Sequence, residues 1–168
     1  MELIIIRHAV AEEREDFVKK GLEDHMRPLT LKGRKRMQKV CVRLLDFVKE
    51  VDLIVSSPLT RARQTAEIVS QIYFETKVVE APELVPHSPP QAFLKWLRTQ
   101  ARTHRRLVIV GHEPHLSSFA SYLLSGKTES FIDLKKSGVI ALEIESFAHA
   151  EAGTAQLLYA IPPKFLID

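Results

Sequence analysis

The feature that most constrains the fold is a regular alternation between short apolar runs and amphipathic stretches. Continuously apolar, β-branched runs are typical of parallel strands that are buried on both faces. Four such runs occupy residues 2–6 (ELIII), 52–57 (DLIVSS), 77–81 (KVVEA) and 106–112 (RLVIVGH). Because amphipathic segments separate these runs, the pattern predicts an α/β fold, with a mainly parallel sheet in a three-layer α/β/α sandwich.

Capping residues predict where the helices between these strands begin. Thr30 is expected to cap a helix that runs to about Glu50, because an apolar stripe near helical period follows it. Ser57 is expected to cap a second helix, with Pro58 at its first position. Further helices are expected after the third and fourth apolar runs.

Two later segments, residues 138–146 and 154–161, alternate more openly between apolar and polar residues. They predict antiparallel or neighbouring strands near one edge of the sheet. The polar segment from Glu12 to Arg27 leaves both helix and loop open. No repeat or linker divides the 168 residues, so residues 1–168 are expected to form a single domain with one sizeable core.

Composition narrows the functional classes. The chain is 45% hydrophobic and 27% charged, and no apolar run approaches the roughly 18–20 residues of a membrane span. Its start lacks a signal-peptide pattern and it has a single cysteine, Cys41, so we expect a cytoplasmic protein without internal disulfides. The net charge of +3 is mild, and the basic run from Lys32 to Arg36 carries no interleaved aromatic residues, so nucleic acid is not the expected partner.

Three of the predicted strands end on cationic or imidazole side chains. Arg7 and His8 close the first strand, Arg61 lies in the helical turn after the second, and His112 follows Gly111 at the end of a later one. In a mainly parallel sheet, ligands bind outside the carboxyl ends of the strands. Guanidinium groups and helix N-termini favour phosphate oxygens. The three strand ends therefore predict a small cationic pocket for a phosphoryl group.

Histidine in such a pocket indicates covalent chemistry. A neutral imidazole is a nucleophile towards phosphorus, and nearby arginines should lower the pKa of His8 and keep it neutral at pH 7. His112 could donate to a phosphoryl oxygen as charge builds in the transition state. An isolated Arg-His pair after a strand is more often a surface turn, so the interpretation depends on all three segments together.

The segments IIIRHAVAE, SSPLTRARQTAEI and VGHEPHLS resemble, in order, the three signature segments of the histidine phosphatase superfamily, which also holds the phosphoglycerate mutases. The short chain and the segment RPLTLKGRKRM resemble most the SixA-type phosphohistidine phosphatases. The resemblance implies a phosphoglycerate-mutase-like fold. It also implies hydrolysis of protein phosphohistidine without a metal or organic cofactor.

The resemblance also implies roles for individual residues. His8 matches the nucleophile that becomes phosphorylated, and Arg7, Arg61 and His112 match the rest of the phosphate pocket. Arg27 matches the additional arginine of the SixA-type pattern; its alternative is a solvated loop arginine. Two more positions bear on the family pattern, and one of them departs from it.

Glu83 falls near the position where many superfamily members keep a proton donor. Ala9 is a departure, because the usual motif is Arg-His-Gly. If that glycine serves a left-handed backbone angle, alanine would strain the turn, whereas if it only gives packing room, one methyl is tolerated.

Other chemistries are less well supported. His112 and His115 are spaced by three and lack a convincing third ligand, so no metal site is expected. Cys41 lies mid-helix between valines and is expected to be structural. The expected partner is a phosphohistidine-bearing protein, such as a phosphotransfer domain, or a small phosphoester. The alternatives are a small-molecule phosphomonoesterase on the same scaffold and a non-catalytic module that binds phosphate.

Overall fold

A computed structural model describes residues 1–101 and 103–167 and places six strands in one sheet, in the order β3-β2-β4-β1-β5-β6. The first four are parallel to one another, whereas β5 runs antiparallel to β1, and β6 antiparallel to β5. The strands are β1 (Glu2–Arg7), β2 (Leu53–Ser56), β3 (Val78–Glu80), β4 (Arg106–Gly111), β5 (Val139–Glu143) and β6 (Gln156–Ile161). The sheet is therefore mainly parallel, with the two late strands forming one edge as their pattern indicated.

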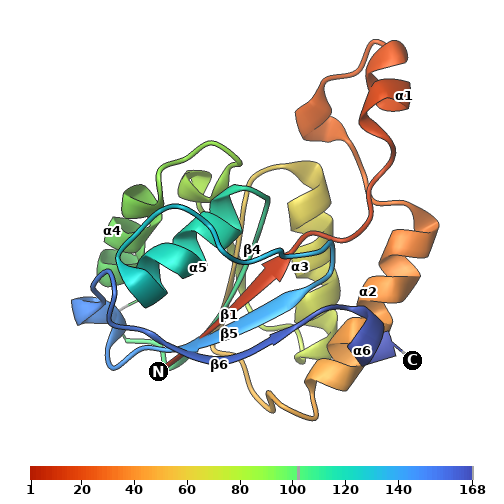
Figure 1. The fold of residues 1–168 in the computed structure, drawn as a ribbon. Coiled ribbons are helices and arrows are strands. Elements are labelled where there is room, and N and C mark those ends of the chain that lie inside the picture. Colours follow the sequence, from red (N-terminus) through yellow and green to blue (C-terminus); the bar gives the residue numbers. More distant parts are fainter. Residues whose placement is uncertain (102, 168) are drawn as a thin grey trace.

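Helices cover both faces of this sheet (Figure 1). Helices α2, α3 and α6 lie on one face, and α4 and α5 lie on the other. The α-helices are α1 (Arg14–Lys19), α2 (Leu31–Leu44), α3 (Thr60–Ile72), α4 (Pro90–Gln100), α5 (His115–Ser125) and α6 (Lys164–Ile167). Short 3-10 turns are η1 (Asp24–Met26), η2 (Pro82–Leu84) and η3 (Phe147–His149). The predicted three-layer α/β/α sandwich is confirmed.

The apolar run of β1 explains why the sheet has two cores. Alternate strand residues point to opposite faces. Leu3 and Ile5 pack with the residues of α4 and α5, while Ile4 and Ile6 pack with those of α2 and α3. All four side chains are fully buried, and burial of each contributes about 1.5–3 kcal/mol. This central position holds the carboxyl end of β1, where Arg7 and His8 follow, in a fixed place.

Two predicted helix boundaries are wrong. The hydroxyl of Thr30 accepts from the Gly33 amide as the expected cap of α2, but the helix ends at Leu44 instead of about Glu50. The chain there turns back towards β2, and Val48, whose amide donates to the Leu44 carbonyl, packs into the core from that turn. The helix therefore ends earlier than expected, because the chain must reverse direction to begin the parallel strand β2.

The second wrong boundary is at α3. The helix begins at Thr60, with Leu59 as its N-cap, instead of at Ser57 and Pro58. The Ser57 hydroxyl lies 2.8 Å from His112 Nε2 and accepts from the Leu59 amide at 3.4 Å, so it belongs to the turn before the helix. No helix among the described residues has the length and apolar character needed to cross a membrane.

Residues 12–27 form a segment that projects beyond the end of the sheet (Figure 1), with its η1 turn packed against α3. We call it the projecting segment; it contains α1 and η1 joined by turns, so both the helix and the loop that its sequence left open are present. Its base is narrow: Ala11 pairs with Leu29, and the Glu12 amide donates to the Pro28 carbonyl. Gly33 leaves room for this base, because a Cβ there would collide with the Val10 carbonyl oxygen.

Candidate active site

Two histidines meet where β1 and β4 end. The strands are neighbours in register, and the His8 amide donates to the Gly111 carbonyl at 3.0 Å. This pairing brings the rings of His8 and His112 to 5.1 Å between centroids. Both side chains are buried, with 5% and 2% of their surfaces exposed. The structure thus brings together residues that are more than a hundred positions apart in sequence.

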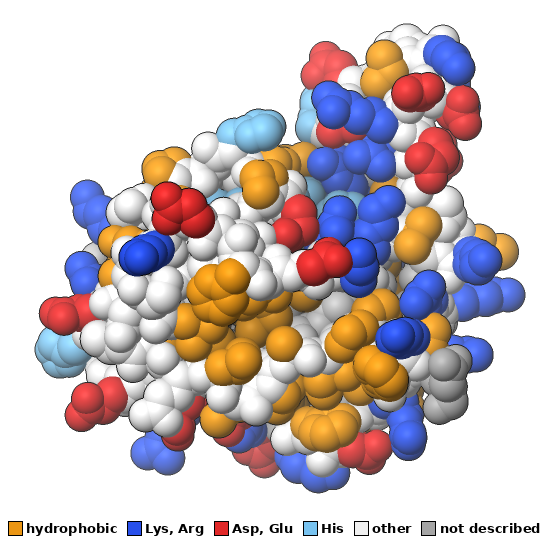
Figure 2. Space-filling view, viewed as in Figure 1, with side chains coloured by type: hydrophobic (Ala, Val, Ile, Leu, Met, Phe, Trp, Pro, Cys, Tyr) orange, Lys and Arg blue, Asp and Glu red, His pale blue; other side chains and the backbone are white. Residues whose placement is uncertain are grey.

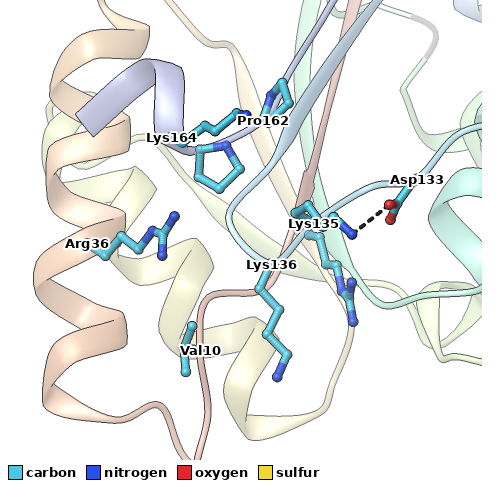
Figure 3. A pocket seen from close by; sticks show the side chains of 9 residues that line it. Val10, Arg36, Asp133, Lys135, Lys136, Pro162 and Lys164 are labelled. Carbon is cyan, nitrogen blue, oxygen red and sulfur yellow. Dashed lines mark ion pairs between the residues drawn. The ribbon is translucent and has the colours of Figure 1, made fainter. Parts of the chain in front are cut away.

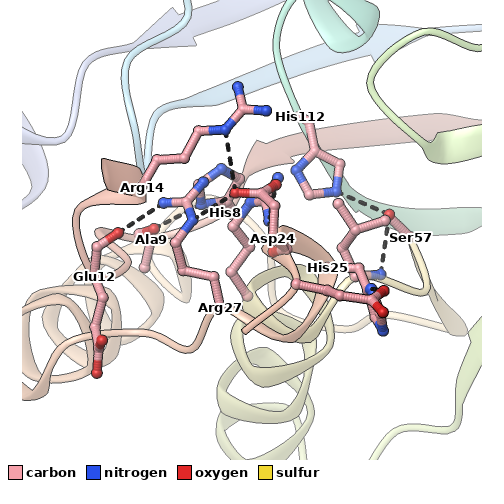
Figure 4. Close-up of polar contacts among 12 residues, drawn as sticks. His8, Ala9, Glu12, Arg14, Asp24, His25, Arg27, Ser57 and His112 are labelled. Atoms are coloured by element: carbon pink, nitrogen blue, oxygen red, sulfur yellow. Dashed lines mark hydrogen bonds and ion pairs between the residues drawn. The ribbon is translucent and has the colours of Figure 1, made fainter. Parts of the chain in front are cut away.

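The tautomer of His8 follows from one contact. Its Nδ1 lies 2.7 Å from the Ala9 carbonyl oxygen (Figure 4). A carbonyl can only accept, so Nδ1 carries the hydrogen and Nε2 keeps its lone pair in the neutral ring. Burial lowers the pKa of His8 to about 3, and the positive charges of Arg61 and Arg7 add to this effect. His8 is therefore a neutral imidazole with a free Nε2 at pH 7.

His112 is held by the end of β2. Its Nε2 lies 2.8 Å from the hydroxyl of Ser57, whose amide donates to the Val110 carbonyl of β4. Its Nδ1 is buried without a partner among the described residues. Burial, the neighbouring His8 and the charge of Arg61 lower the pKa of His112 to about 2. Because the ring is neutral, one nitrogen is a donor and the other an acceptor.

Two arginines converge on the same place from different elements. Arg61 comes from the first turn of α3 and is only 5% exposed, whereas Arg27 follows η1 in the projecting segment. Arg27 NH1 donates to the Glu12 carbonyl at 2.7 Å, which fixes its position above the base of that segment. The structure thus brings Arg27 alongside Arg61 instead of leaving it as a solvated loop arginine.

Arg7 is anchored on the opposite side by the loop before β5. Its NH1 donates to the Leu134 carbonyl at 2.8 Å, and its buried Nε has no partner among the described residues. The Ser137 amide donates to the carbonyls of Arg7 and His8. Ser137 is fully buried with φ at 63°, a left-handed angle that costs a non-glycine residue of order 1 kcal/mol. The loop is therefore held tightly against the turn that carries His8.

Together these groups can bind and attack a tetrahedral dianion. Guanidinium groups supply charge and hydrogen-bond donors, and a neutral imidazole presents a free nitrogen in their midst. Among the described residues, no three His, Cys, Asp or Glu side chains come close enough to hold a metal ion. Cys41 is buried in the core, and burial raises the pKa of its thiol to about 12, so it is not an activated nucleophile.

Comparison with known proteins decides the family. Residues 3–85, which include Arg7, His8, Arg27 and Arg61, match the model of the histidine phosphatase superfamily, branch 1. The chain belongs to the histidine phosphatase superfamily. It is also 38% identical to an uncharacterized protein of Picosynechococcus sp., over 99% of both chains.

Solved structures show which superfamily members share this fold. The protein histidine phosphatase SixA, complexed with tungstate, matches with a TM-score of 0.81 and 22% identity over 99% of both chains. The α-ribazole phosphatase of Shigella flexneri matches with a TM-score of 0.72 and 22% identity over 97% of both chains. The sandwich is thus the phosphoglycerate-mutase-like fold, shared by proteins named for protein and for small-molecule substrates.

Asp24 is the site residue that sequence reasoning missed in this histidine phosphatase. Its Oδ1 lies 3.0 Å from Arg27 Nε and 3.6 Å from Arg14 Nε, and its Oδ2 lies 3.3 Å from Arg61 NH1 (Figure 4). Partial burial alone would raise the pKa of Asp24, but the Arg27 hydrogen bond and the Arg61 charge hold it below its usual value. A carboxylate therefore lies on the two arginines that would bind phosphate. No sequence signal marked it, because the projecting segment has no clear period.

Ala9 replaces the usual glycine of the superfamily without a left-handed backbone, since its φ is not positive. Its side chain is fully buried in the core on the α2 and α3 side. Its amide donates to Thr65 Oγ1 at 3.1 Å, and that hydroxyl donates to the Arg61 carbonyl at 2.7 Å. Of the two readings of this position, the one in which a single methyl is accommodated fits the structure.

Glu83 lies in η2, directly after β3, and is half-buried. The turn approaches the end of β4, because a Cβ built on Gly111 would lie 3.3 Å from the Leu84 carbonyl oxygen. Glu83 Oε2 is buried without a hydrogen-bond partner among the described residues. Glu83 is therefore at the correct edge of the sheet, and its role as a proton donor stays a prediction.

Proposed function

We propose that this protein is a phosphatase that hydrolyses protein phosphohistidine through a covalent phospho-His8 intermediate. The observation that carries the proposal is the hydrogen bond from His8 Nδ1–H to the Ala9 carbonyl. It places the ring hydrogen on Nδ1 and leaves the Nε2 lone pair free, and burial with the nearby charges of Arg61 and Arg7 keeps that lone pair unprotonated. A nucleophile fixed in this way is needed only for covalent transfer, since binding phosphate requires the arginines alone.

The proposed reaction has two steps. His8 Nε2 attacks the phosphorus in line and forms a new P–N bond. The P–N bond to the substrate histidine breaks, and its electron pair stays on the departing ring nitrogen, which takes a proton from solvent. Water then attacks phospho-His8, breaks the second P–N bond and releases inorganic phosphate. His8 returns to the neutral state in which it began.

The remaining residues stabilise charge on the transferring group. Arg7, Arg27 and Arg61 would neutralise its three equatorial oxygens, and His112 would donate from a ring nitrogen as the negative charge develops. Asp24 must leave Arg27 and Arg61 before a phosphoryl group can occupy them. In this scheme the positive charge comes from side chains, so we expect activity to persist in EDTA.

A histidine leaving group suits this site better than an alcohol. The ring nitrogen is less basic than an alkoxide, so its departure depends less on a general acid. The similarity of the fold to SixA, and the SixA-type pattern around Arg27, support the same substrate class. The partner would be a phosphohistidine-bearing protein such as a phosphotransfer domain, and we place this encounter in the cytoplasm.

One observation favours a second candidate, a small-molecule phosphomonoesterase. The buried, unpartnered oxygen of Glu83 lies at the edge of the sheet where an ester leaving group would need a proton. The fold is also that of α-ribazole phosphatase. If esters are the substrates, Glu83→Gln should lower kcat towards an alkyl phosphate far more than towards an activated aryl phosphate.

The test compares phosphate release from a phosphohistidine-bearing phosphotransfer domain and from para-nitrophenyl phosphate, both in EDTA. It uses the wild-type chain, His8→Ala and, as a matched control, His25→Ala in the projecting segment. We expect faster release from the phosphohistidine protein, loss of at least about 10³-fold in His8→Ala and no loss in His25→Ala. Quenching with alkaline detergent at short times should trap phosphate on the wild-type chain as an alkali-stable, acid-labile adduct.

The opposite results have distinct meanings. Preference for the ester would assign the protein to the small-molecule class and make Glu83 the next residue to change. Phosphate binding without turnover of either substrate would replace the enzyme with a phosphate-binding module.

A further inference from the structure

A basic pocket opens beside the candidate active site. It has a volume of about 620 Å³ and lies between α2, the loop before β5 and the chain that follows β6 (Figure 3). Five of its nine lining residues are cationic, and one is acidic: the cations are Arg7, Arg36, Lys135, Lys136 and Lys164. We call these five residues and the space between them the basic pocket.

The single carboxylate does not neutralise this charge. Asp133 Oδ2 lies 2.6 Å from Lys135 Nζ, but both side chains are largely exposed, at 75% and 62%. An exposed pair of this kind contributes only about 0–1 kcal/mol, so an incoming carboxylate can replace it at little cost. Four further cations then face the same space.

Two of the cations are partly buried and have unused donors. The Nε atoms of Arg7 and Arg36 are both buried and have no hydrogen-bond partner among the described residues. A buried donor without a partner costs about 1–3 kcal/mol, which an acceptor brought by a ligand would recover. Lys135 and Lys164 lie at the exposed rim instead. The charge therefore extends from the surface to the floor of the pocket.

The pocket adjoins the turn that carries His8. Arg7 lines it and directly precedes His8, and the positive charge of Lys136 helps to lower the pKa of His8. Lys135 and Lys136 directly precede Ser137, whose amide donates hydrogen bonds to the carbonyls of Arg7 and His8. A ligand in the pocket would thus lie next to a phosphoryl group on His8.

Space-filling shows how this charge is presented. Lys and Arg side chains gather in the hollow below the projecting segment, between it and the apolar surface of the sheet edge (Figure 2). The rim is open to solvent, which suits side chains reaching in from the surface of another protein.

We propose that the basic pocket binds an acidic side chain next to the phosphohistidine of a protein substrate. This inference rests on the proposed function and adds a specificity determinant to it. The phosphoryl group would lie on Arg27, Arg61 and Arg7, while a neighbouring Asp or Glu would reach Arg36, Lys135 and Lys164. Substrates would be selected by charge beside the reacting group.

The experiment uses two synthetic phosphohistidine peptides that differ only at the flanking positions, Glu in one and Gln in the other. We expect kcat/KM to be about 5–20-fold higher for the Glu peptide at low ionic strength, through KM. Salt at 0.5 M should reduce this preference, because screening weakens charge pairing at an open rim. Lys164→Glu and Arg36→Gln should each reduce the ratio between the peptides, whereas Lys39→Glu, one turn further along α2 and not among the lining residues of the basic pocket, should not.

A second measurement does not depend on turnover. The unphosphorylated Glu peptide is titrated into the wild-type chain in a calorimeter, with Lys164→Glu and Lys39→Glu alongside. We expect salt-sensitive binding that Lys164→Glu weakens at least fivefold and Lys39→Glu leaves unchanged.

The two claims can fail separately. Equal kcat/KM for two peptides that are both hydrolysed would overturn the pocket assignment and leave the phosphohistidine activity standing. If neither peptide is hydrolysed but the Glu peptide binds as described, the proposed function fails and the pocket remains an acidic-peptide site. Absence of binding in the calorimeter would sink the pocket in either case.

Discussion

The candidate site has two halves that are built in different ways. His8, His112 and Arg61 are held at the ends of β1 and β4 and the start of α3, and none is more than 5% exposed. Arg27 and Asp24 come from the projecting segment, which is joined to the rest through a narrow base. The sheet fixes the groups that we propose to react, and the projecting segment carries groups that are held by fewer buried contacts.

The difference follows from packing. The strand ends are held in place because the β1 and β4 residues before them are buried on both faces of the sheet. The projecting segment leaves Val18, Leu22 and Met26 about half exposed, and only Phe17 of α1 is buried. Elements with few buried apolar contacts open at low free-energy cost. We therefore expect chemistry to depend on the first half and access to depend on the second.

The largest expected effect compares one arginine from each half. Arg61→Ala should lower kcat/KM by about 10²–10³-fold, because a preorganised donor in a buried site acts mainly on the transition state. Arg27→Ala should lower it only about tenfold and mostly through KM. Steady-state kinetics on both variants, with Arg61→Lys to separate charge from the planar fork, checks this. Equal losses from the two alanine variants would break the comparison.

The next largest expected effect is a loss of folding stability at low pH, which is caused by buried histidines. The pKa values of His8, His112 and His115 are lowered to about 3, 2 and 4, mainly by burial. As the pH falls, each histidine is therefore protonated in the unfolded chain near pH 6.5, well before it is protonated in the folded protein. The stability that these neutral rings give is complete above that pH and is lost as the pH falls below it. Below that pH, each histidine lowers the free energy of unfolding by about 1.4 kcal/mol per pH unit.

Urea unfolding between pH 7 and pH 5 measures this slope. His115→Leu should remove about one histidine's share, because the His115 ring is 2% exposed, has no partner among the described residues and stacks on Phe119. His25→Gln, in the exposed projecting segment, should leave the slope as it is. An unchanged slope in His115→Leu would show that its ring is protonated or solvated in the folded state.

The smallest effect concerns Asp24. Its carboxylate lies on Arg27 and Arg61, so Asp24→Asn should remove a competitor for anions and tighten inhibition by tungstate about 3–10-fold. Glu23→Gln is the matched control, since Glu23 is exposed and pairs only with His25 among the described residues. Weaker tungstate inhibition in Asp24→Asn would mean that Asp24 positions the arginines instead of competing for them.

The sequence predicted the first half of the site better than the second, for a physical reason. Buried strands leave a continuous apolar signature, and a parallel sheet collects their carboxyl ends at one edge, so Arg7, His8 and His112 could be placed together. Arg27 was placed only through family resemblance.

The contacts that the sequence did not reveal are those made across segments. Asp24 meets Arg61 only because a short base turns the projecting segment over α3, and neither residue's neighbours encode that turn. Ser57 was assigned to a helix cap, because the competing contact with His112 comes from β4, over fifty residues away. The helix end at Leu44 was missed for a similar reason, since the path back to β2 sets it.

The position of β1 in the sheet has a consequence for how the chain is made. This first strand pairs with residues 106–111 on one side and residues 139–143 on the other. During synthesis, His8 therefore leaves the ribosome before residues 106–143, at the end of an apolar strand whose partners have not yet been made. Long-range pairing of this kind slows folding and leaves the unpaired strand open to misassociation. His8 is therefore synthesised before both partners of its strand and reaches its final place only after they have followed.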